Sequence, residues 1–498
     1  MQWSEVIHGL PTLALGDTTR ADILAIAYDS REVRPGTLFV AMRGETTDGN
    51  RYVRNALDAG ASAIVTDSRE SFAFADARHV PAALIEHGRQ ALAIVSANFY
   101  QHPERVLKLT GITGTNGKTT TAFLVESLLK LAGRKSALIG TIETHIVDEV
   151  RPSPHTTPES RDVLAIFADA VTAGATEAVM EMSSHALAQE RVFGIPVDVA
   201  IFTNLTQDHL DFHGTMEAYA QAKARLFQGV GAPAPRVAII NADDPYVSLM
   251  RNAASACETT WTYGIDTEAD FRATNVTLHA GTTTFVLQTP FGNAEITSYL
   301  TGRVNVYNLL AALAAAIGRG LVFDDVVDFV AELKPVPGRF ETVSNTLGFS
   351  VVVDYAHTDD ALRNLITLAR ELAGPARVIT LFGCGGDRDK TKRPKMGRAA
   401  GEGSDIVLIT SDNPRSEDPV IIAQEALVGV EASGNRNVRI ILDRAEAITC
   451  AVNEAQPGDI VLIAGKGHEK TQTAKGVSVP FDDVAVAAAA LRTRETNA

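Results

Sequence analysis

A glycine-rich loop with one lysine and several threonines is the strongest chemical signal in the chain. Its glycines can turn backbone N–H groups toward phosphate oxygens, its lysine can neutralise the β- and γ-phosphates, and the next threonine can bind Mg²⁺. The general spacing of such loops would place a further glycine at position 112, which is Ile112. The motif by itself predicts phosphate binding and no particular reaction, and a plain Gly/Thr connection is the alternative. The residues expected to contact a nucleotide here are Gly114, Thr115, Asn116, Gly117, Lys118, Thr119 and Thr120.

Acids and histidines of the kind that bind metals follow two further predicted strands. Glu181 ends a strand over residues 178–180, and a carboxylate there suits Mg²⁺, which takes few protein oxygens and shares substrate phosphates. His209 follows a strand over residues 199–202 and stands beside Asp208, so a hydrogen-bonded structural role is equally compatible with it. Lys223 taken alone indicates a solvated helix face, because an ammonium group repels Mg²⁺.

Four polar motifs follow four predicted strands in the last third of the chain. Because the carboxyl ends of parallel strands share one edge of a sheet, we expect these motifs to converge on one crevice. An ordinary Asx-Pro turn is the alternative for the third motif. The strands cover residues 351–353, 378–382, 406–410 and 460–464, and the motifs cover residues 354–357, 383–389, 411–415 and 465–469.

Alternating strand-like and helical patterns predict an α/β protein with parallel sheets. The phosphate loop leads into an amphipathic helix with Leu124, Leu128 and Leu131 that ends at Gly133. A chain of 498 residues is too long for one core, and prolines and glycines break the pattern near residues 101–104 and 334–338. We therefore predict three domains, over residues 1–102, 103–336 and 337–498. The central domain should hold a P-loop ATPase-type sheet and the last domain a Rossmann-like sheet.

Composition narrows the classes of function. The formal charge of −15 argues against a nucleic-acid binder or a membrane-surface protein, since both normally need a basic face. Three cysteines without metal-site spacing predict neither disulfides nor a zinc site, and Cys384 is expected to be a packed thiol. No signal peptide and no membrane-spanning segment are recognisable. We expect a cytoplasmic protein that does not insert into membranes.

Eight motifs in a fixed order resemble the Mur ligase family and cover nearly the whole chain. They are TGTNGKTTT, EMSSHAL, TNLTQDHLDFHG, NVYNLLAA, PGRFE, VVDYAHT, GCGGDRD and AGKGHE. The N-terminal run DSREVRPGTLFVA is similar to the uridine-binding domain of the family member that forms the tripeptide. The resemblance implies a monomeric, ADP-forming ligase of peptidoglycan synthesis that joins an amino acid to the D-Glu γ-carboxyl of UDP-MurNAc-L-Ala-D-Glu through an acyl phosphate.

The resemblance also assigns metal and nucleotide residues. It implies two Mg²⁺ ions, with Thr119 and Glu181 on one and His209 at the second. It makes Lys223 a carbamylated lysine (N6-carboxylysine), which would turn a repelling cation into an anionic oxygen ligand. Together with Lys118, residues Glu181, His209 and Lys223 are the expected catalytic set. Asn305 and Asn308 are implied on the adenine side of ATP, with helix caps as the alternative, and Arg339 and Asp354 are implied at the γ-phosphate and ribose.

Further residues are carried over for the other two substrates. Arg415 can hold the distal carboxylate of meso-2,6-diaminopimelate by two charge-assisted hydrogen bonds, a group that lysine lacks. A site built around such a pair can discriminate by about 10⁴-fold or more. The diaminopimelate residues are Arg388, Asp412, Asn413, Pro414, Arg415, Gly465 and Glu469. The residues for the sugar-peptide are Ser30, Thr156, Thr157, Ser183, Gln189 and Arg191.

Three alternatives remain at this point. A lysine-adding homologue would share most motifs but has no evident need for Arg415. A folylpolyglutamate-type relative would not be expected to carry the uridine-type N-terminal segment. A non-ligase P-loop nucleotide switch would need no second substrate pocket, and its ATPase activity would be independent of any amino acid.

Overall fold

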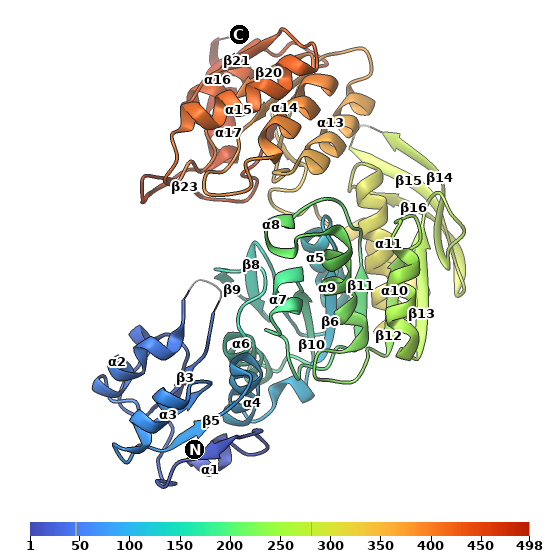
Figure 1. The fold of residues 1–498 in the computed structure, drawn as a ribbon. Coiled ribbons are helices and arrows are strands. Elements are labelled where there is room, and N and C mark those ends of the chain that lie inside the picture. The colour runs from blue at the N-terminus through green and yellow to red at the C-terminus, as the bar shows by residue number, and fades with distance from the viewer. Residues whose placement is uncertain (45–46, 280, 498) are drawn as a thin grey trace.

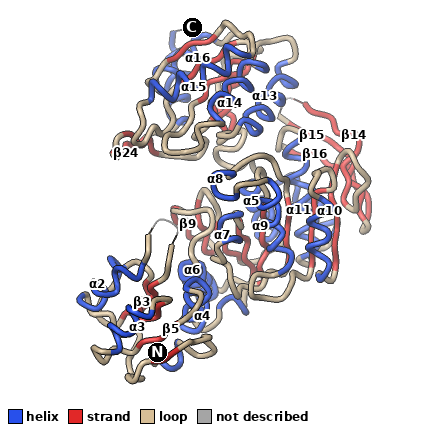
Figure 2. The backbone as a smooth tube through the Cα atoms, viewed as in Figure 1, coloured by secondary structure: helices blue, strands red, loops and turns tan. Residues whose placement is uncertain are grey.

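The computed structural model describes residues 1–44, 47–279 and 281–497. Three α/β domains follow one another from the N-terminus to the C-terminus, and each has its own sheet (Figure 1). Figure 2 shows the strands inside each domain with helices packed around them. The predicted three-domain α/β architecture is confirmed.

The N-terminal domain holds a five-stranded sheet in the order β1-β5-β4-β3-β2. All neighbouring strands are parallel except the edge pair β1 and β5. The strands are β1 (Ala14–Leu15), β2 (Ala25–Ala27), β3 (Thr37–Ala41), β4 (Ala63–Thr66) and β5 (Ala82–Leu84). The helices are α1 (Trp3–Val6), α2 (Val53–Asp58), α3 (Arg69–Asp76) and α4 (Gly88–Phe99), with the short 3₁₀ turns η1 (Ser30–Glu32), η2 (Gly49–Tyr52) and η3 (Pro103–Arg105).

The central domain holds an eleven-stranded sheet in the order β16-β15-β14-β13-β12-β11-β6-β10-β7-β8-β9. Its middle, from β14 to β7, is parallel as predicted, but antiparallel strands that the sequence reading did not foresee extend both ends. The strands are β6 (Lys108–Thr113), β7 (Ser136–Ile139), β8 (Glu143–Ile146), β9 (Glu149–Pro152), β10 (Glu177–Glu181), β11 (Val199–Phe202), β12 (Val237–Asn241), β13 (Thr259–Gly264), β14 (Phe271–His279), β15 (Thr282–Thr289) and β16 (Gly292–Ser298).

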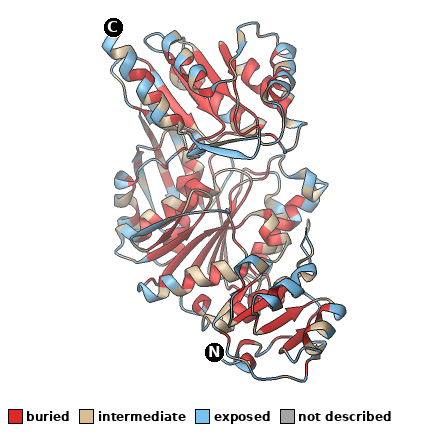
Figure 3. Ribbon diagram, turned by 90° about the vertical axis from the view of Figure 1, so that its left-hand side faces the viewer, coloured by how far each residue is buried: buried red, intermediate tan, exposed pale blue. Residues whose placement is uncertain are grey.

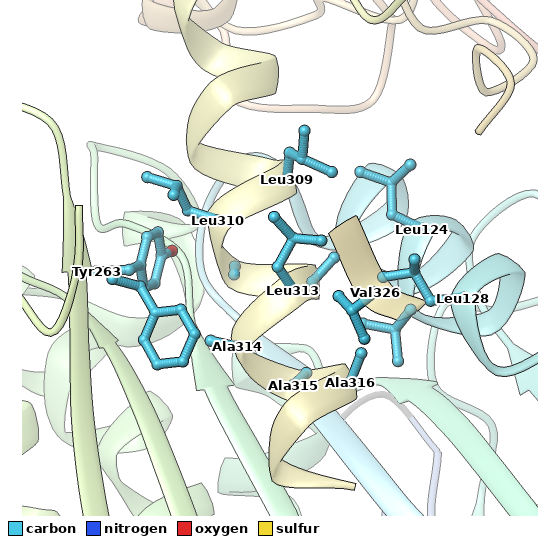
Figure 4. Packing of buried hydrophobic residues seen from close by; sticks show 14 of the residues in the cluster. Leu124, Leu128, Tyr263, Leu309, Leu310, Leu313, Ala314, Ala315, Ala316 and Val326 are labelled. Carbon is cyan, nitrogen blue, oxygen red and sulfur yellow. The ribbon is translucent and has the colours of Figure 1, made fainter. Parts of the chain in front are cut away.

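Helices cover both faces of this sheet. They are α5 (Lys118–Leu131), α6 (Ser160–Thr172), α7 (Ser184–Ala188), α8 (Leu210–His213), α9 (Met216–Gln228), α10 (Val247–Ala253), α11 (Arg303–Gly318) and α12 (Phe323–Phe329), with η4 (Ala254–Ala256) and η5 (Val330–Glu332). Helix α11 is buried along nearly its whole length, and its leucines and small alanines let it lie close to α5 and the sheet (Figure 4). This packing fixes the start of α11 beside the phosphate loop.

The C-terminal domain holds a six-stranded sheet in the order β17-β18-β22-β19-β20-β21, parallel except at β17. Residues of α13, α14 and α15 join the core on one face, and residues of α16 and α17 join the core on the other. The strands are β17 (Glu341–Val343), β18 (Ser350–Asp354), β19 (Val378–Phe382), β20 (Ile406–Ile409), β21 (Val438–Ile440) and β22 (Ile460–Ala464), and a separate hairpin holds β23 (Thr471–Ala474) and β24 (Val477–Pro480). The helices are α13 (Asp359–Ala373), α14 (Lys392–Gly403), α15 (Pro419–Ala432), α16 (Arg444–Glu454) and α17 (Asp483–Asn497).

Burial follows the expected pattern, with buried strands inside each domain and helices exposed on their outer sides (Figure 3). Cys384 is buried, and burial raises the pKa of its thiol to about 12, which agrees with the predicted packed thiol. Among the described residues, no helix has the length and apolar character needed to cross a membrane.

Candidate functional site

A cavity of about 630 Å³ lies between the central and C-terminal domains. The phosphate loop and Glu181 line it from the central domain. All four strand-end motifs of the C-terminal domain line it from the other side, so the predicted convergence on one crevice is confirmed. Of the predicted site residues, the cavity is lined by Thr115, Asn116, Gly117, Lys118, Thr119, Thr120, Thr156, Glu181, Ser183, His209, Asn305, Asn308, Arg339, Asp354, Arg388, Asp412, Asn413, Arg415, Gly465 and Glu469.

The phosphate loop connects β6 to α5 and wraps around the Lys118 side chain. The Lys118 ammonium donates hydrogen bonds to the carbonyl oxygens of Gly114 (3.0 Å) and Thr115 (2.8 Å), and burial lowers its pKa. Gly117 has a φ of +83°, and a Cβ there would lie 2.5 Å from the side-chain oxygen of Asn308. The loop therefore requires glycine at this point, where it passes close to α11.

Glu181 is the centre of a cluster of oxygen atoms at the end of β10. Its carboxylate accepts hydrogen bonds from the Thr119 hydroxyl (3.0 Å), the Thr141 amide (2.7 Å) and the Thr141 hydroxyl (3.1 Å). The Thr156 hydroxyl lies 3.0 Å from that of Thr141. Hard oxygen donors beside a phosphate loop fit Mg²⁺, which completes its coordination with water and substrate phosphates. No group of three or more His, Cys, Asp or Glu in the described part of the chain could hold a metal without such help.

His209 is the N-cap residue that precedes α8 and has a φ of +53°, and its imidazole lies 3.4 Å from the Asp208 carboxylate. Its ring also packs edge-on against His185 at 4.7 Å. Although 44% of the His209 side chain is exposed, desolvation by the surrounding groups lowers its pKa to about 4, which favours the neutral ring that can offer a lone pair to a ligand.

Lys223 is buried, which corrects the solvated helix face that its residue type suggested. It lies on the inner side of α9, where its amine donates to the Gly114 carbonyl (2.7 Å) and lies 4.4 Å from the Tyr219 ring centre. Burial and the nearby Lys118 ammonium lower its pKa well below the usual value. Periodicity could not reveal this, because the alanines beside Lys223 do not distinguish a helix face turned inward from one turned outward.

The predicted ATP residues come from two domains. Asn305 lies in the first turn of α11, after the cap at Gly302, so the helix-cap alternative does not describe it. Asn308 donates a hydrogen bond to the Asn305 side-chain oxygen (3.2 Å). Arg339, from the C-terminal domain, donates to the Thr119 hydroxyl of the phosphate loop (3.1 Å). Burial raises the pKa of Asp354, whose carboxylate accepts hydrogen bonds from the backbone amides of Phe340 (2.7 Å) and Ala356 (2.8 Å).

Two of the predicted sugar-peptide residues, Thr156 and Ser183, line the cavity, and the others lie outside its lining. Thr157 is buried and donates to the Glu181 carbonyl (2.9 Å), while its hydroxyl lies 3.4 Å from that of Ser183. Arg191 donates to the Thr157 carbonyl (3.0 Å) and to the Gln189 side chain (3.0 Å). Ser30 lies in the N-terminal domain.

The N-terminal domain is held against the central domain close to Ser30. The Tyr28 hydroxyl, two residues earlier, donates to the Asp162 carboxylate of α6 (2.7 Å). The Arg161 guanidinium, also on α6, donates to the Ile26 carbonyl (3.2 Å). These contacts hold the segment that immediately precedes Ser30 and η1 against the central domain.

Loop 411–418, which follows β20, lies beside loop 383–389, which follows β19. The Arg415 guanidinium donates to the Gly386 carbonyl (2.6 Å), and Arg415 has a φ of +52°. Pro414 packs against Gly386, where no Cβ would fit. Arg388 belongs to loop 383–389, and its one hydrogen bond to the described residues is a long one to the Asp387 carbonyl (3.4 Å). Two guanidinium groups, those of Arg388 and Arg415, therefore line the cavity.

Polar residues of loops 411–418 and 465–469 line the same cavity. Asn413 donates to the Glu469 carboxylate (2.8 Å), and burial raises the pKa of Asp412. Gly465 has a φ of +114°, and a Cβ there would lie 2.8 Å from the Asp412 carboxylate. Although burial opposes it, the Lys466 ammonium lowers the pKa of Glu469, to which it donates at 2.9 Å. The same cavity is thus lined by guanidinium groups and by carboxylates, the two kinds of group that a zwitterionic amino acid requires.

Thr141 and Lys466 contribute to this site but were not predicted from the sequence. Thr141 follows β7 and supplies two of the hydrogen bonds to Glu181, but a single threonine after a short strand carries no signal. Lys466 lies inside the AGKGHE motif and is completely buried, and its ammonium donates to the side chains of Asn413 and Glu469. Its position between two glycines of the motif was the one signal for it in the sequence.

Comparison with known proteins is consistent along the whole chain. Residues 22–100 match the Mur ligase family catalytic domain, residues 112–316 the Mur ligase middle domain, and residues 338–467 the Mur ligase glutamate ligase domain. A UDP-N-acetylmuramoyl-L-alanyl-D-glutamate--2,6-diaminopimelate ligase from Solibacter usitatus is 50% identical over 97% of this chain and 96% of its own. The ligase of the same name from Geobacillus thermodenitrificans is 44% identical over 99% and 100%.

Solved structures agree. A structure of a UDP-N-acetylmuramoyl-L-alanyl-D-glutamate--2,6-diaminopimelate ligase aligns with a TM-score of 0.70 and 34% identity over 99% of both chains. A MurF ligase from Thermotoga maritima in complex with ADP aligns with a TM-score of 0.63 over 95% of this chain and 98% of its own. At 20% identity, the second likeness concerns the fold alone.

Proposed function

The chain belongs to the Mur ligase family, and we propose that it joins meso-2,6-diaminopimelate to the D-Glu γ-carboxyl of UDP-MurNAc-L-Ala-D-Glu with ATP. One observation supports this proposal most strongly: Lys118 of the phosphate loop and Arg415 of the C-terminal domain line the same cavity. A nucleotide switch would need no further substrate region, lined with the guanidinium groups of Arg388 and Arg415, in that cavity. Relatives at 41–50% identity over nearly the full length carry the corresponding name.

The proposed reaction has two steps. The D-Glu γ-carboxylate oxygen attacks the γ-phosphorus of ATP, and the bond between this phosphorus and the β–γ bridging oxygen breaks. ADP is released, and an acyl phosphate is formed on D-Glu. The free amine of diaminopimelate then attacks the acyl carbon, loses a proton and expels inorganic phosphate from a tetrahedral intermediate. An amide and phosphate result, so each peptide bond consumes one ATP.

The protein contributes position and charge to these steps. Lys118 and Arg339 would approach the phosphoryl group from two different domains. The contacts of Lys118 within the phosphate loop and of Arg339 with Thr119 support this role. Thr119 and Glu181 would hold one Mg²⁺, and His209 and Lys223 would serve a second. When bound, these ions neutralise the phosphate oxygens. The amine that attacks must be unprotonated, and the buried Asp412 and the half-buried Glu469 would hold the two amino groups of diaminopimelate.

Carbamylation of Lys223 is part of the proposal. Only a neutral amine attacks CO₂, and the burial of Lys223 together with the nearby Lys118 favours the neutral form. The carbamate would then bring oxygen ligands to a buried position beside the phosphate loop. Incubation with ¹³C-bicarbonate should give a carbamate resonance in the NMR spectrum of the wild type that is missing in Lys223→Ala. Identical spectra would exclude the modification.

We further propose a cytoplasmic, monomeric enzyme with domain boundaries after residues 102 and 336. The UDP-sugar would lie along Ser30, Thr157 and Arg191, between the N-terminal and central domains. Its dipeptide would extend past Ser183 and Thr156 to the cavity.

The test is phosphate release from ATP and Mg²⁺ with each remaining substrate omitted in turn. The proposal requires release only when both UDP-MurNAc-L-Ala-D-Glu and meso-diaminopimelate are present. Release that is indifferent to the amino acid would favour the nucleotide switch, and release with lysine in place of diaminopimelate would favour the lysine-adding homologue.

A further inference from the structure

Two arginines are the largest fully buried side chains in the described part of the chain, and both lie behind the proposed diaminopimelate pocket. Arg393 is on α14, and Arg444 is on α16. An arginine loses favourable hydration when it is buried, so such a residue persists only where several acceptors surround it. The acceptors around these two side chains are the ends of loop 411–418 and its neighbours.

Arg393 joins the two loops that carry the pocket's cations. Its guanidinium donates to the Glu417 carboxylate through both terminal nitrogens (2.8 and 3.1 Å), and to the Glu425 carboxylate of α15 (2.6 Å). It also donates to the Gly385 carbonyl of loop 383–389 (3.3 Å). One planar group therefore links the loop of Arg388 to the loop of Arg415.

Glu417 passes this connection on to the backbone. Its carboxylate accepts the Asp387 amide hydrogen (2.6 Å), and the Asp387 carboxylate in turn accepts from the amide and hydroxyl of Ser416 (3.2 and 2.6 Å). Asp387 and Arg415 both have positive φ values, so both loops adopt backbone conformations that side chains disfavour. These conformations require surrounding contacts, and the Arg393–Glu417 pair supplies them from beneath.

Arg444 fixes the opposite end of the same loop. It forms a fully buried ion pair with Asp483 (2.7 Å), and it donates to the carbonyls of Ser411 (3.4 Å) and Ala464 (3.0 Å). Those carbonyls directly precede Asp412 and Gly465. Loop 411–418 is thus held at its start by Arg444 and at its end by Arg393.

We propose that Arg393, through Glu417, is a positioning residue that holds Arg388 and Arg415 at the spacing that recognises the distal carboxylate of diaminopimelate. The inference rests on the proposed function. Two cations repel each other in an empty pocket. If surrounding contacts already hold the two guanidinium groups in place, binding of the carboxylate does not cost the conformational entropy of ordering them. Arg393 touches no substrate in this account and acts only through the two loops.

The alternative is that Arg393 merely stabilises the domain. The chain offers a matched control in Arg377, which donates to the Asp459 carboxylate (2.6 and 3.0 Å) and to the Glu454 carbonyl (3.0 Å). Arg377 and Asp459 directly precede β19 and β22, so this pair lies at the opposite edge of the same sheet from the cavity. Its loss should lower stability without reaching the pocket.

The experiment compares Arg393→Lys, Glu417→Gln and Arg377→Lys in the full-length enzyme by steady-state kinetics and thermal unfolding. We expect Arg393→Lys and Glu417→Gln to raise the KM for diaminopimelate about tenfold or more, as losses of supporting contacts commonly do. The KM for ATP should stay unchanged, and the preference for diaminopimelate over lysine should fall. Arg377→Lys should lower the unfolding temperature and leave all three KM values unchanged.

Glu417→Gln removes one charge and keeps the size of the side chain. It therefore tests the positioning role of the Arg393–Glu417 pair even if Arg393→Lys does not fold. An unchanged KM for diaminopimelate in the folded variants, or an equal rise in Arg377→Lys, would overturn the inference. A wild type that does not turn over diaminopimelate would instead overturn the proposed function, so the two failures are distinguishable.

Discussion

Lys118 is the residue on which the phosphoryl-transfer proposal depends most. In the structure its ammonium is held by two carbonyls of its own loop, which places a cation where the phosphates would lie. Lys118→Ala should lower kcat on the order of 10²- to 10³-fold, because it removes charge stabilisation from a preorganised site. Circular dichroism and thermal unfolding would show that the fold is kept. A folded variant with substantial turnover would contradict the assignment.

Arg415 is the corresponding residue for amino-acid selectivity. Arg415→Met keeps much of the side chain's length but removes the group that would pair with the distal carboxylate. We expect kcat/KM for diaminopimelate to fall about 10²-fold or more, since a charge-assisted pair is lost, while the low value for lysine changes little. The measurement is the ratio of the two kcat/KM values. An unchanged ratio would assign selectivity to other residues.

At the scale of elements, helix α5 offers a controlled test of its loop. Gly117 precedes the helix and Gly133 follows it, and both have positive φ values. Alanine at either position should cost about 1–2 kcal/mol of stability through backbone strain. Only at Gly117 would the new Cβ also meet Asn308, because nothing lies within 4 Å of a Cβ at Gly133.

Gly117→Ala should therefore raise the KM for ATP, whereas Gly133→Ala should not. Steady-state kinetics with ATP as the varied substrate, alongside denaturant unfolding of both variants, makes the comparison. Equal KM values in the two variants would show that the close approach of the loop to Asn308 has no role in nucleotide binding.

Elements with a local signal were predictable from the sequence. The predicted strands 378–382 and 460–464 have the same bounds as β19 and β22, because both are short apolar runs ended by glycine. The antiparallel strands β14 to β16 were not foreseen, although they pair with one another in chain order and β15 alternates between buried and half-buried side chains, which is a local signal of such a strand. Arg393 and Arg444 gave no signal, because an arginine's burial depends on acceptors brought together only by folding.

At the scale of the whole molecule, the site belongs to two domains that already touch. Asn116 of the phosphate loop donates to the Asp360 carboxylate of α13 (2.9 Å), and Arg339 donates to Thr119 (3.1 Å). Lys395 of α14 reaches the Gln207 side chain (3.3 Å). These few polar contacts can be exchanged for contacts to ATP, and closure around the substrates would exclude water from the acyl phosphate.

The half-buried His357, which lines the cavity, gives the molecule a pH dependence. Burial lowers the pKa of His357 from 6.5 to about 4, so the unfolded chain binds a proton that the folded chain does not. The free energy of unfolding therefore contains this contribution in full above pH 6.5 and loses it as the pH falls toward 4. Denaturant unfolding over this range should show a smaller acid loss in His357→Asn than in the wild type. The exposed His8 provides a control, and His8→Asn should follow the wild type.

The central claim is that this chain adds diaminopimelate, and the most direct measurement is the mass of the product formed in competition. The enzyme would receive ATP, Mg²⁺, UDP-MurNAc-L-Ala-D-Glu and equal concentrations of meso-diaminopimelate and L-lysine. We predict a UDP-MurNAc-tripeptide that carries diaminopimelate almost exclusively. A product that carries lysine, or no tripeptide despite ATP hydrolysis, would contradict the account.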